Sequence, residues 1–152
     1  MSEPVAERIM AAVRTRMAVY TSSYRSTHVA TWQPKDLTIH VYQGEIVRNE
    51  EMGCPGNPPA TAWDMTAIVA GIVKPSTTDT TPIDTFKNRF WAEIVKAATV
   101  ADQWHTWGGL AYDTQINDVE DYTSDDGSMA GVKVSMVIRF RTDEDDPYAV
   151  RA

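Results

Sequence analysis

The residue types best suited to chemistry in this chain are one cysteine and three histidines. Cys54 lies in a Gly-Cys-Pro-Gly segment. A nucleophilic thiol there would need a base and an orienting group, and the local sequence supplies neither. His28, His40 and His105 have no Cys or His partner at a spacing typical of metal ligands. We therefore predict no catalytic residue, no metal site and no cofactor, and we expect that the protein is not an enzyme.

The acidic residues between positions 118 and 126 are the next candidates, because clustered carboxylates can bind calcium. An EF-hand loop that began at Asp121 would need glycine at its sixth position and glutamate at its twelfth. The chain has Asp126 and Val132 at those two positions. We interpret this segment as the solvated tip of a β-hairpin.

Aromatic side chains could stack on nucleic-acid bases or on sugars. We expect Trp63 and Trp91 to lie in the core, because each belongs to an apolar segment. Trp104 and Trp107 flank a turn that contains two glycines, where packing under a sheet and anchoring an interface are both open. Basic residues are not interleaved with the tryptophans, Trp32 included, so single-stranded nucleic acid is not an expected ligand.

The secondary-structure elements that would position these residues are predicted most clearly near the end of the chain. From position 131 to 141, apolar and mostly polar residues alternate, which predicts a strand with one buried face. Its buried set is Val132, Val134, Met136, Ile138 and Phe140. The acidic segment 142–152 follows, and we expect it to be an exposed tail.

Two amphipathic helices are predicted. In residues 4–20 an apolar residue recurs at every fourth position from Val5 to Met17. In residues 81–101, Thr81 can cap the helix and Pro82 suits its first position. The apolar stripe of this second helix includes Ile94 and Ala97.

Three further strands are predicted, at residues 37–44, 61–73 and 110–122. The first could continue through residues 45–48 after a kink, and the second should be buried on both faces along much of its length. Residues 50–60 contain three prolines and two glycines, so we expect an exposed loop without regular structure. This loop is a candidate for docking a partner, through residues that include Glu50, Glu51, Cys54 and Asn57.

The order of these elements favours the α+β class. We expect a mixed, mostly antiparallel sheet with the two amphipathic helices packed on one face. A length of 152 residues is enough for one buried core, so we expect a single domain over 1–152.

Charge is unevenly distributed over the chain, whose net charge is −7. Residues 1–36 carry five Lys or Arg against three acids, whereas residues 110–152 carry four against ten. This argues against general DNA binding and would suit head-to-tail contacts between copies, with a tail that only aids solubility as the alternative. The candidate interface residues are Arg14, Arg16 and Arg25 on one side and Asp143, Glu144, Asp145 and Asp146 on the other.

The sequence predicts neither a membrane-spanning segment nor a secretory signal. The longest apolar run, 67–73, is too short to span a bilayer, and the first residues lack the apolar stretch of a secretory signal. Because there is one cysteine, no intrachain disulfide can form, and synthesis in a reducing cytoplasm is expected.

As a whole, the chain resembles the tail terminator (tail completion) family of tailed bacteriophages, of the minor tail protein U type. The resemblance rests on the helical segment AERIMAAVRTRM, the strand that begins PKDLTIH, and the strand at 61–73. It also rests on the capped helix up to position 101 and the closing segment IRFRTDEDDPY.

The resemblance implies a structural virion protein that forms a hexameric ring on the head-proximal end of the tail tube. Such a ring ends tube polymerisation and provides the surface for head–tail joining. Its partners would be further copies, the tail tube protein and a neck or head-completion protein, with DNA passing through without sequence recognition. The protein would be made in the host cytoplasm. The alternatives are another neck or head-completion connector, or a small ligand-binding domain or enzyme with a pocket at His105 and Trp107.

Overall fold

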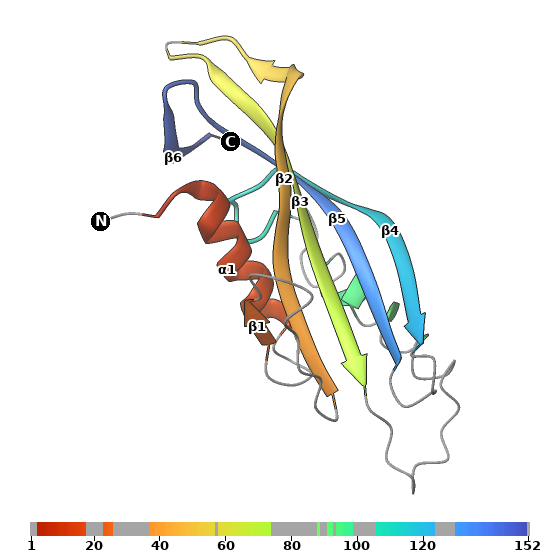
Figure 1. Ribbon diagram of the computed structural model, residues 1–152. Coiled ribbons are helices and arrows are strands. Elements are labelled where there is room, and N and C mark those ends of the chain that lie inside the picture. The colour runs from red at the N-terminus through yellow and green to blue at the C-terminus, as the bar shows by residue number, and fades with distance from the viewer. Residues whose placement is uncertain are drawn as a thin grey trace, which may run out of the picture.

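The computed structural model describes residues 3–17, 23–25, 37–56, 58–73, 88, 91–92, 94–98, 106–123 and 130–151. Figure 1 shows the N-terminal helix lying along a long, twisted sheet. The elements with defined bounds are α1 (Val5–Met17), β1 (Ser23–Arg25), β2 (Leu37–Cys54), β3 (Ala60–Val73), β4 (Asp113–Thr123), β5 (Ala130–Asp143) and β6 (Asp146–Arg151).

Within the described residues, six strands form one sheet in the order β1-β2-β3-β5-β4, and β6 pairs with β5. Only the β1–β2 pair is parallel. The last β4–β5 pair is Asp113 with Arg139, and β6 pairs with Arg141 and the residues that follow it. Beyond the pair of Asp113 with Arg139, β6 therefore replaces β4 as the strand that pairs with this edge of β5. The predicted α+β class with a mixed, mostly antiparallel sheet is confirmed.

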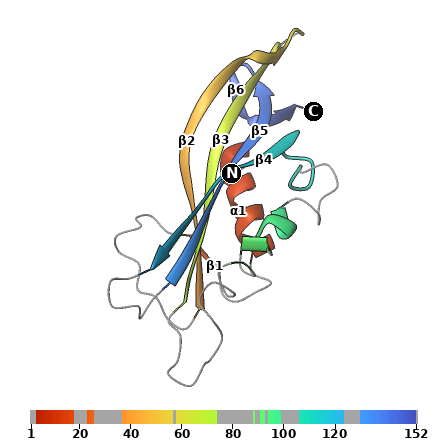
Figure 2. The ribbon, with the colours of Figure 1, turned by 90° about the vertical axis from the view of Figure 1, so that its right-hand side faces the viewer.

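Helices cover one face of this sheet. Helix α1 buries Val5, Ile9, Val13 and Met17, the predicted stripe. Described residues between 88 and 98 are also helical, and their Ile94 belongs to the same buried cluster. Figure 2 shows both helical segments on the same side of the strands.

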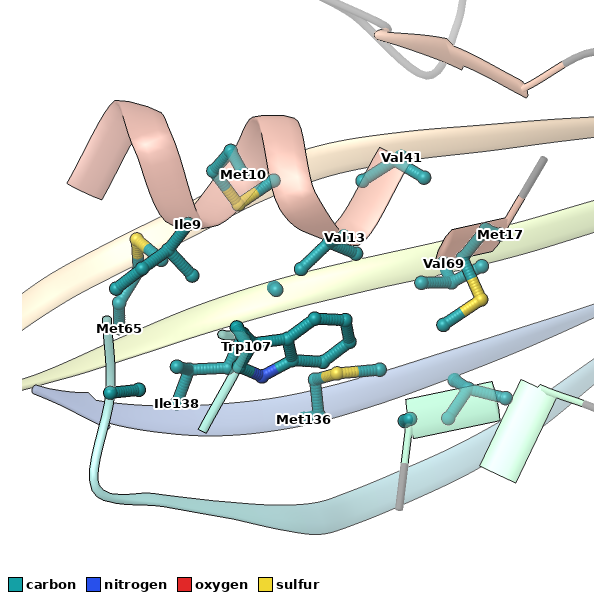
Figure 3. Close-up of a cluster of buried hydrophobic side chains, with 14 of the residues drawn as sticks. Ile9, Met10, Val13, Met17, Val41, Met65, Val69, Trp107, Met136 and Ile138 are labelled. Atoms are coloured by element: carbon teal, nitrogen blue, oxygen red, sulfur yellow. The ribbon is translucent and has the colours of Figure 1, made fainter. Parts of the chain in front are cut away.

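The core lies between α1 and the inner face of the sheet. All five residues of the predicted β5 set, Val132 to Phe140 at alternate positions, are at most 3% exposed. They meet Met65, Ala67 and Val69 of β3. Figure 3 shows Trp107 in this core with Ile138 and Met136 beside it and α1 above. The period-two alternation therefore identified the inner face of β5 correctly.

The predicted irregular loop at 50–60 is wrong. Strand β2 continues to Cys54, which pairs with Ala60 of β3, so the connection is confined to residues 55–59. Within this segment Cys54 pairs with β3, and the carbonyl of Met52 accepts a hydrogen bond from Arg141, although the composition is poor for a strand. Register shifts at Gln43/Ile46, where a kink was expected, and at Asn49/Cys54 accommodate the irregular sequence.

The segment 142–152 is not an unpaired tail, although its residues 144–148 are exposed as expected. Thr142 is 1% exposed, and its hydroxyl accepts a hydrogen bond of 3.0 Å from Nε1 of Trp63. A two-residue turn at Glu144 and Asp145 then leads into β6. Because the turn returns the chain to the edge of β5, the segment pairs its backbone instead of leaving it in water.

Two burial predictions need correction. Burial of β3 on both faces holds in part: Ala62 and Ala70 of its outer face are buried, whereas Thr66 and Ile68 are partly exposed. Trp91, expected in the core, is 42% exposed. Helical periodicity gives the direction of a side chain, but not whether a packing surface lies beneath it.

Candidate interaction surfaces

Two sets of predicted site residues lie side by side at one end of the sheet. Cys54 pairs with Ala60, and Ala60 pairs with Asp143. The end of β2, expected to dock a partner, therefore adjoins the acidic segment expected to contact another copy. We call the exposed residues of this region the distal surface: Glu50, Glu51, Met52, Glu144, Asp145, Asp146 and Tyr148. Figure 1 shows it at the upper end of the molecule.

Hydrogen bonds fix the distal surface in place. The amide N of Glu144 donates to the carbonyl of Pro59 at 2.9 Å. Nη1 of Arg151 donates to the carbonyl of Pro58 at 3.1 Å and to Oδ1 of Asp143 at 2.7 Å. The β2–β3 connection is thus tied to the β5–β6 turn, and Asp143 forms an ion pair within its own chain.

Arg141 holds the neighbouring part of β2. Its Nε donates to the carbonyl of Met52 at 3.0 Å, and its guanidinium lies 4.1 Å from the ring centre of Tyr112. Burial raises the pKa of Tyr112, while the nearby charge of Arg141 acts in the opposite direction. The backbone at Met52 is therefore fixed while its side chain remains 41% exposed.

The second half of β2 is exposed on both of its faces. Every residue from Glu45 to Gly53 except Asn49 is exposed. Ile46 and Val47, which point to opposite faces, are 40% and 49% exposed. This exposed strand was not predicted, because the sequence pattern was interpreted as a short extension at 45–48 followed by a loop at 50–60. Two adjacent large apolar residues, Ile46 and Val47, were the sequence feature that could have indicated a strand exposed on both faces.

The arginines predicted for the interface lie away from the distal surface. Arg14 is exposed on α1, and Arg25 lies on β1 opposite Val41. The guanidinium of Arg16 lies 4.0 Å from the ring centre of Trp107, a distance typical of a cation–π contact. Both named helix arginines occupy the half of α1 farther from β6.

Beside Arg16 there is a groove of about 480 Å³, which we call the α1 groove. Its lining is mostly apolar and comes from Ala11, Ala12, Thr15, Arg16, Trp107 and Gly108. The small side chains of α1 leave this space open at the surface.

Trp107 is held firmly at the base of the α1 groove. It is 2% exposed, and its Nε1 donates a 2.8 Å hydrogen bond to the hydroxyl of Thr114. Its backbone φ of 54° lies in the left-handed region, which is strained for a bulky residue. The turn is closed by a 2.9 Å bond from the amide of Ala111 to the carbonyl of Thr106. Of the two predicted roles for Trp107, core packing is the one observed.

The outer face of the sheet carries ion pairs. Arg139 lies 3.5 Å from Asp64 and 3.1 Å from Asp113. Nζ of Lys133 lies 3.1 Å from Glu120, and this hydrogen bond raises the pKa of Lys133. These pairs are partly exposed, so each contributes about 0–1 kcal/mol to stability.

Burial alters two other titrating groups on this face. It lowers the pKa of His40 from its usual 6.5 and raises the pKa of Tyr42. Both shifts follow from the cost of moving a charge out of water.

Among the described residues, no group of three or more His, Cys, Asp or Glu side chains could hold a metal ion. No helix in that part of the chain is long and apolar enough to cross a membrane. Asn57, His28, His105, Trp32 and Trp104 lie outside the described residues.

No protein-family model matches the chain, and no curated protein matches it. Among solved structures, it is similar to one described as "Cryo-EM Structure of an Extracellular Contractile Injection System, PVC sheath/tube terminator in extended state". The TM-score is 0.45 and the identity 10%, over 97% of this chain and 60% of the other. This chain thus spans about three-fifths of that protein's length. A likeness of this extent assigns neither a family nor a function.

Proposed function

We propose that the protein is a structural subunit that caps the head-proximal end of a phage tail tube as a ring. The ring ends tube polymerisation and provides the surface for head–tail joining, so the protein acts in the virion and performs no catalysis. The observation that carries this proposal is the exposed second half of β2. The sequence resemblance to tail terminators supports the specific role.

A strand with both faces uncovered is unfavourable in an isolated protein. Ile46, Val47 and Met52 expose large apolar side chains, and complete burial of each would stabilise a complex by up to about 1.5–3 kcal/mol relative to full exposure. No described strand pairs with the other edge of this half of β2, and such an edge also invites association with another chain. The segment is therefore suited to being covered by another subunit.

A ring needs a heterologous contact, in which one patch of each copy meets a different patch of the next. The acidic distal surface and the arginines of α1 supply two different patches with opposite charge. Repeated contacts of this kind close into a ring only when a whole number of equal rotations from one copy to the next makes a full turn. Six copies would satisfy this requirement in the proposed ring.

Light scattering over a range of concentrations, with negative-stain images of the same sample, tests the proposal. We expect sixfold rings or, if rings close only on a template, binding to the ends of purified tail tubes. The variant Ile46→Ser/Val47→Ser should remain folded but lose both. A protein that stays monomeric and ignores tube ends would overturn the proposal. Binding to necks but not to tubes would indicate a different connector.

A further inference from the structure

We propose that the distal surface of one copy binds in the α1 groove of the next copy, with Met52 as the apolar anchor. This inference rests on the proposed ring, and it identifies which two surfaces meet. It also gives Glu50 and Glu51 a role between copies, in place of a role against the tube or neck.

The α1 groove has the shape and chemistry to accept an apolar side chain next to an acidic one. Ala11, Ala12 and Gly108 leave its volume of about 480 Å³ open and mostly apolar. Arg16 contributes a guanidinium at one wall. Arg14 follows Ala11 by three residues, so it lies beside the groove on the helix surface.

The distal surface carries the complementary groups. Met52 is 41% exposed and is preceded by the exposed Glu50 and Glu51. A methionine side chain is flexible and polarizable, so it adapts to an irregular apolar space. Because Arg141 holds the carbonyl of Met52, little backbone conformational freedom would be lost on binding.

The same chain cannot make this contact with itself. Strand β2 is paired with β3 as far as Cys54, and β3 is paired with β5 over its whole length. Figure 1 shows the distal surface and the C-terminal end of α1 at different levels along the sheet. The two surfaces are therefore available to different neighbours, as a heterologous contact requires.

Disulfide trapping of the full-length protein tests the pairing. In a Cys54→Ser background, the single variants Ala11→Cys and Met52→Cys are mixed and oxidised under mild conditions. The matched control replaces Ala11→Cys by Gln115→Cys, an exposed position on β4. We expect a cross-linked dimer of twice 16.9 kDa, formed about tenfold more efficiently than in the control because contact raises the effective thiol concentration.

Charge exchange supplies a second readout. Arg14→Glu and Glu51→Arg should each raise the concentration at which half of the protein is assembled by about threefold to tenfold, and the double variant should restore it. Circular dichroism confirms that each variant is folded. Assembly without cross-linking above the control, or without rescue, would overturn the inference and leave the proposed function standing. Cross-linking above the control by a protein that forms no rings and never binds tube ends would support the inference and overturn the proposed function. The absence of any assembly, both in solution and on tube ends, would overturn both.

Discussion

At the scale of single residues, Trp107 is constrained in three ways at once. It combines a left-handed backbone, a buried hydrogen bond to Thr114 and a guanidinium over its ring. Strained backbone persists only where the surroundings fix it. Trp107 therefore links α1, the turn before β4 and the inner face of β5.

We expect Trp107→Phe to lower the free energy of unfolding by about 2–3 kcal/mol. The change leaves a cavity and a buried hydroxyl of Thr114 without its donor. Trp91→Phe is the matched control, because Trp91 is 42% exposed, and it should change stability by at most about 0.5 kcal/mol. Urea unfolding measures both. Equal losses in the two variants would contradict this assignment.

His40 should make stability depend on pH. Burial lowers its pKa below 6.5 in the folded state, so the unfolded state binds the proton more readily. The free energy of unfolding should therefore fall as pH decreases through about 6.5. Urea unfolding at about pH 7.5 and 5.5 should show a smaller loss in His40→Gln than in the wild type. An identical loss in both proteins would contradict the prediction.

At the scale of elements, periodicity was decisive where one face of a strand is fully buried. The alternation from Val132 to Phe140 predicted the inner face of β5 because each apolar side chain belongs to the buried cluster that also contains α1. The same reasoning failed at the distal end. There, of the segment from Glu50 to Cys54, only Cys54 pairs with β3, and the register shift between Asn49 and Cys54 leaves no alternation in the sequence.

Strand β6 was missed for a related reason. Its charged start and Pro147 are typical of a turn or an edge, and only the turn at Glu144 and Asp145 returns it to β5. The two predicted docking segments were correctly placed on the surface of the molecule. Their adjacency could not be predicted, because it depends on which strands are neighbours in the sheet.

Arg151 should control the order of the distal surface. Arg151→Ala removes the ion pair with Asp143 and the bond to Pro58. We expect faster amide exchange at residues 54–60, with a loss of global stability of about 1 kcal/mol or less. Hydrogen exchange read by mass spectrometry measures this. Arg48→Ala, at an exposed position of β2, is the control, and unchanged exchange in Arg151→Ala would refute the assignment.

At the scale of the whole molecule, two patches of opposite charge are separated in space. Five acids lie at the distal surface, whereas Arg14 and Arg16 lie in the second half of α1. A net charge of −7 keeps copies apart in solution unless opposite patches meet. Association should therefore be specific in orientation and sensitive to salt.

We expect assembly of the wild type to weaken as salt is raised from about 50 to 500 mM, because exposed charges are screened over shorter distances. Arg14→Glu/Arg16→Glu should assemble less well and respond less to salt. Light scattering measures the assembly, and circular dichroism shows whether the fold survives the loss of the Arg16–Trp107 contact. Salt-independent assembly of the wild type would contradict an electrostatic contact.

The continuous pairing of β3 with β5, from Ala60 to Val73, has a mechanical consequence. Inter-strand hydrogen bonds lie across the strands, so a pull along the sheet loads them together in shear. Because the β2–β3 connection is tied to the β5–β6 turn, force applied at the distal end is shared between neighbouring strands. The sheet should therefore resist extension along its strands, and it should transmit tension along its length before the strands slide past one another.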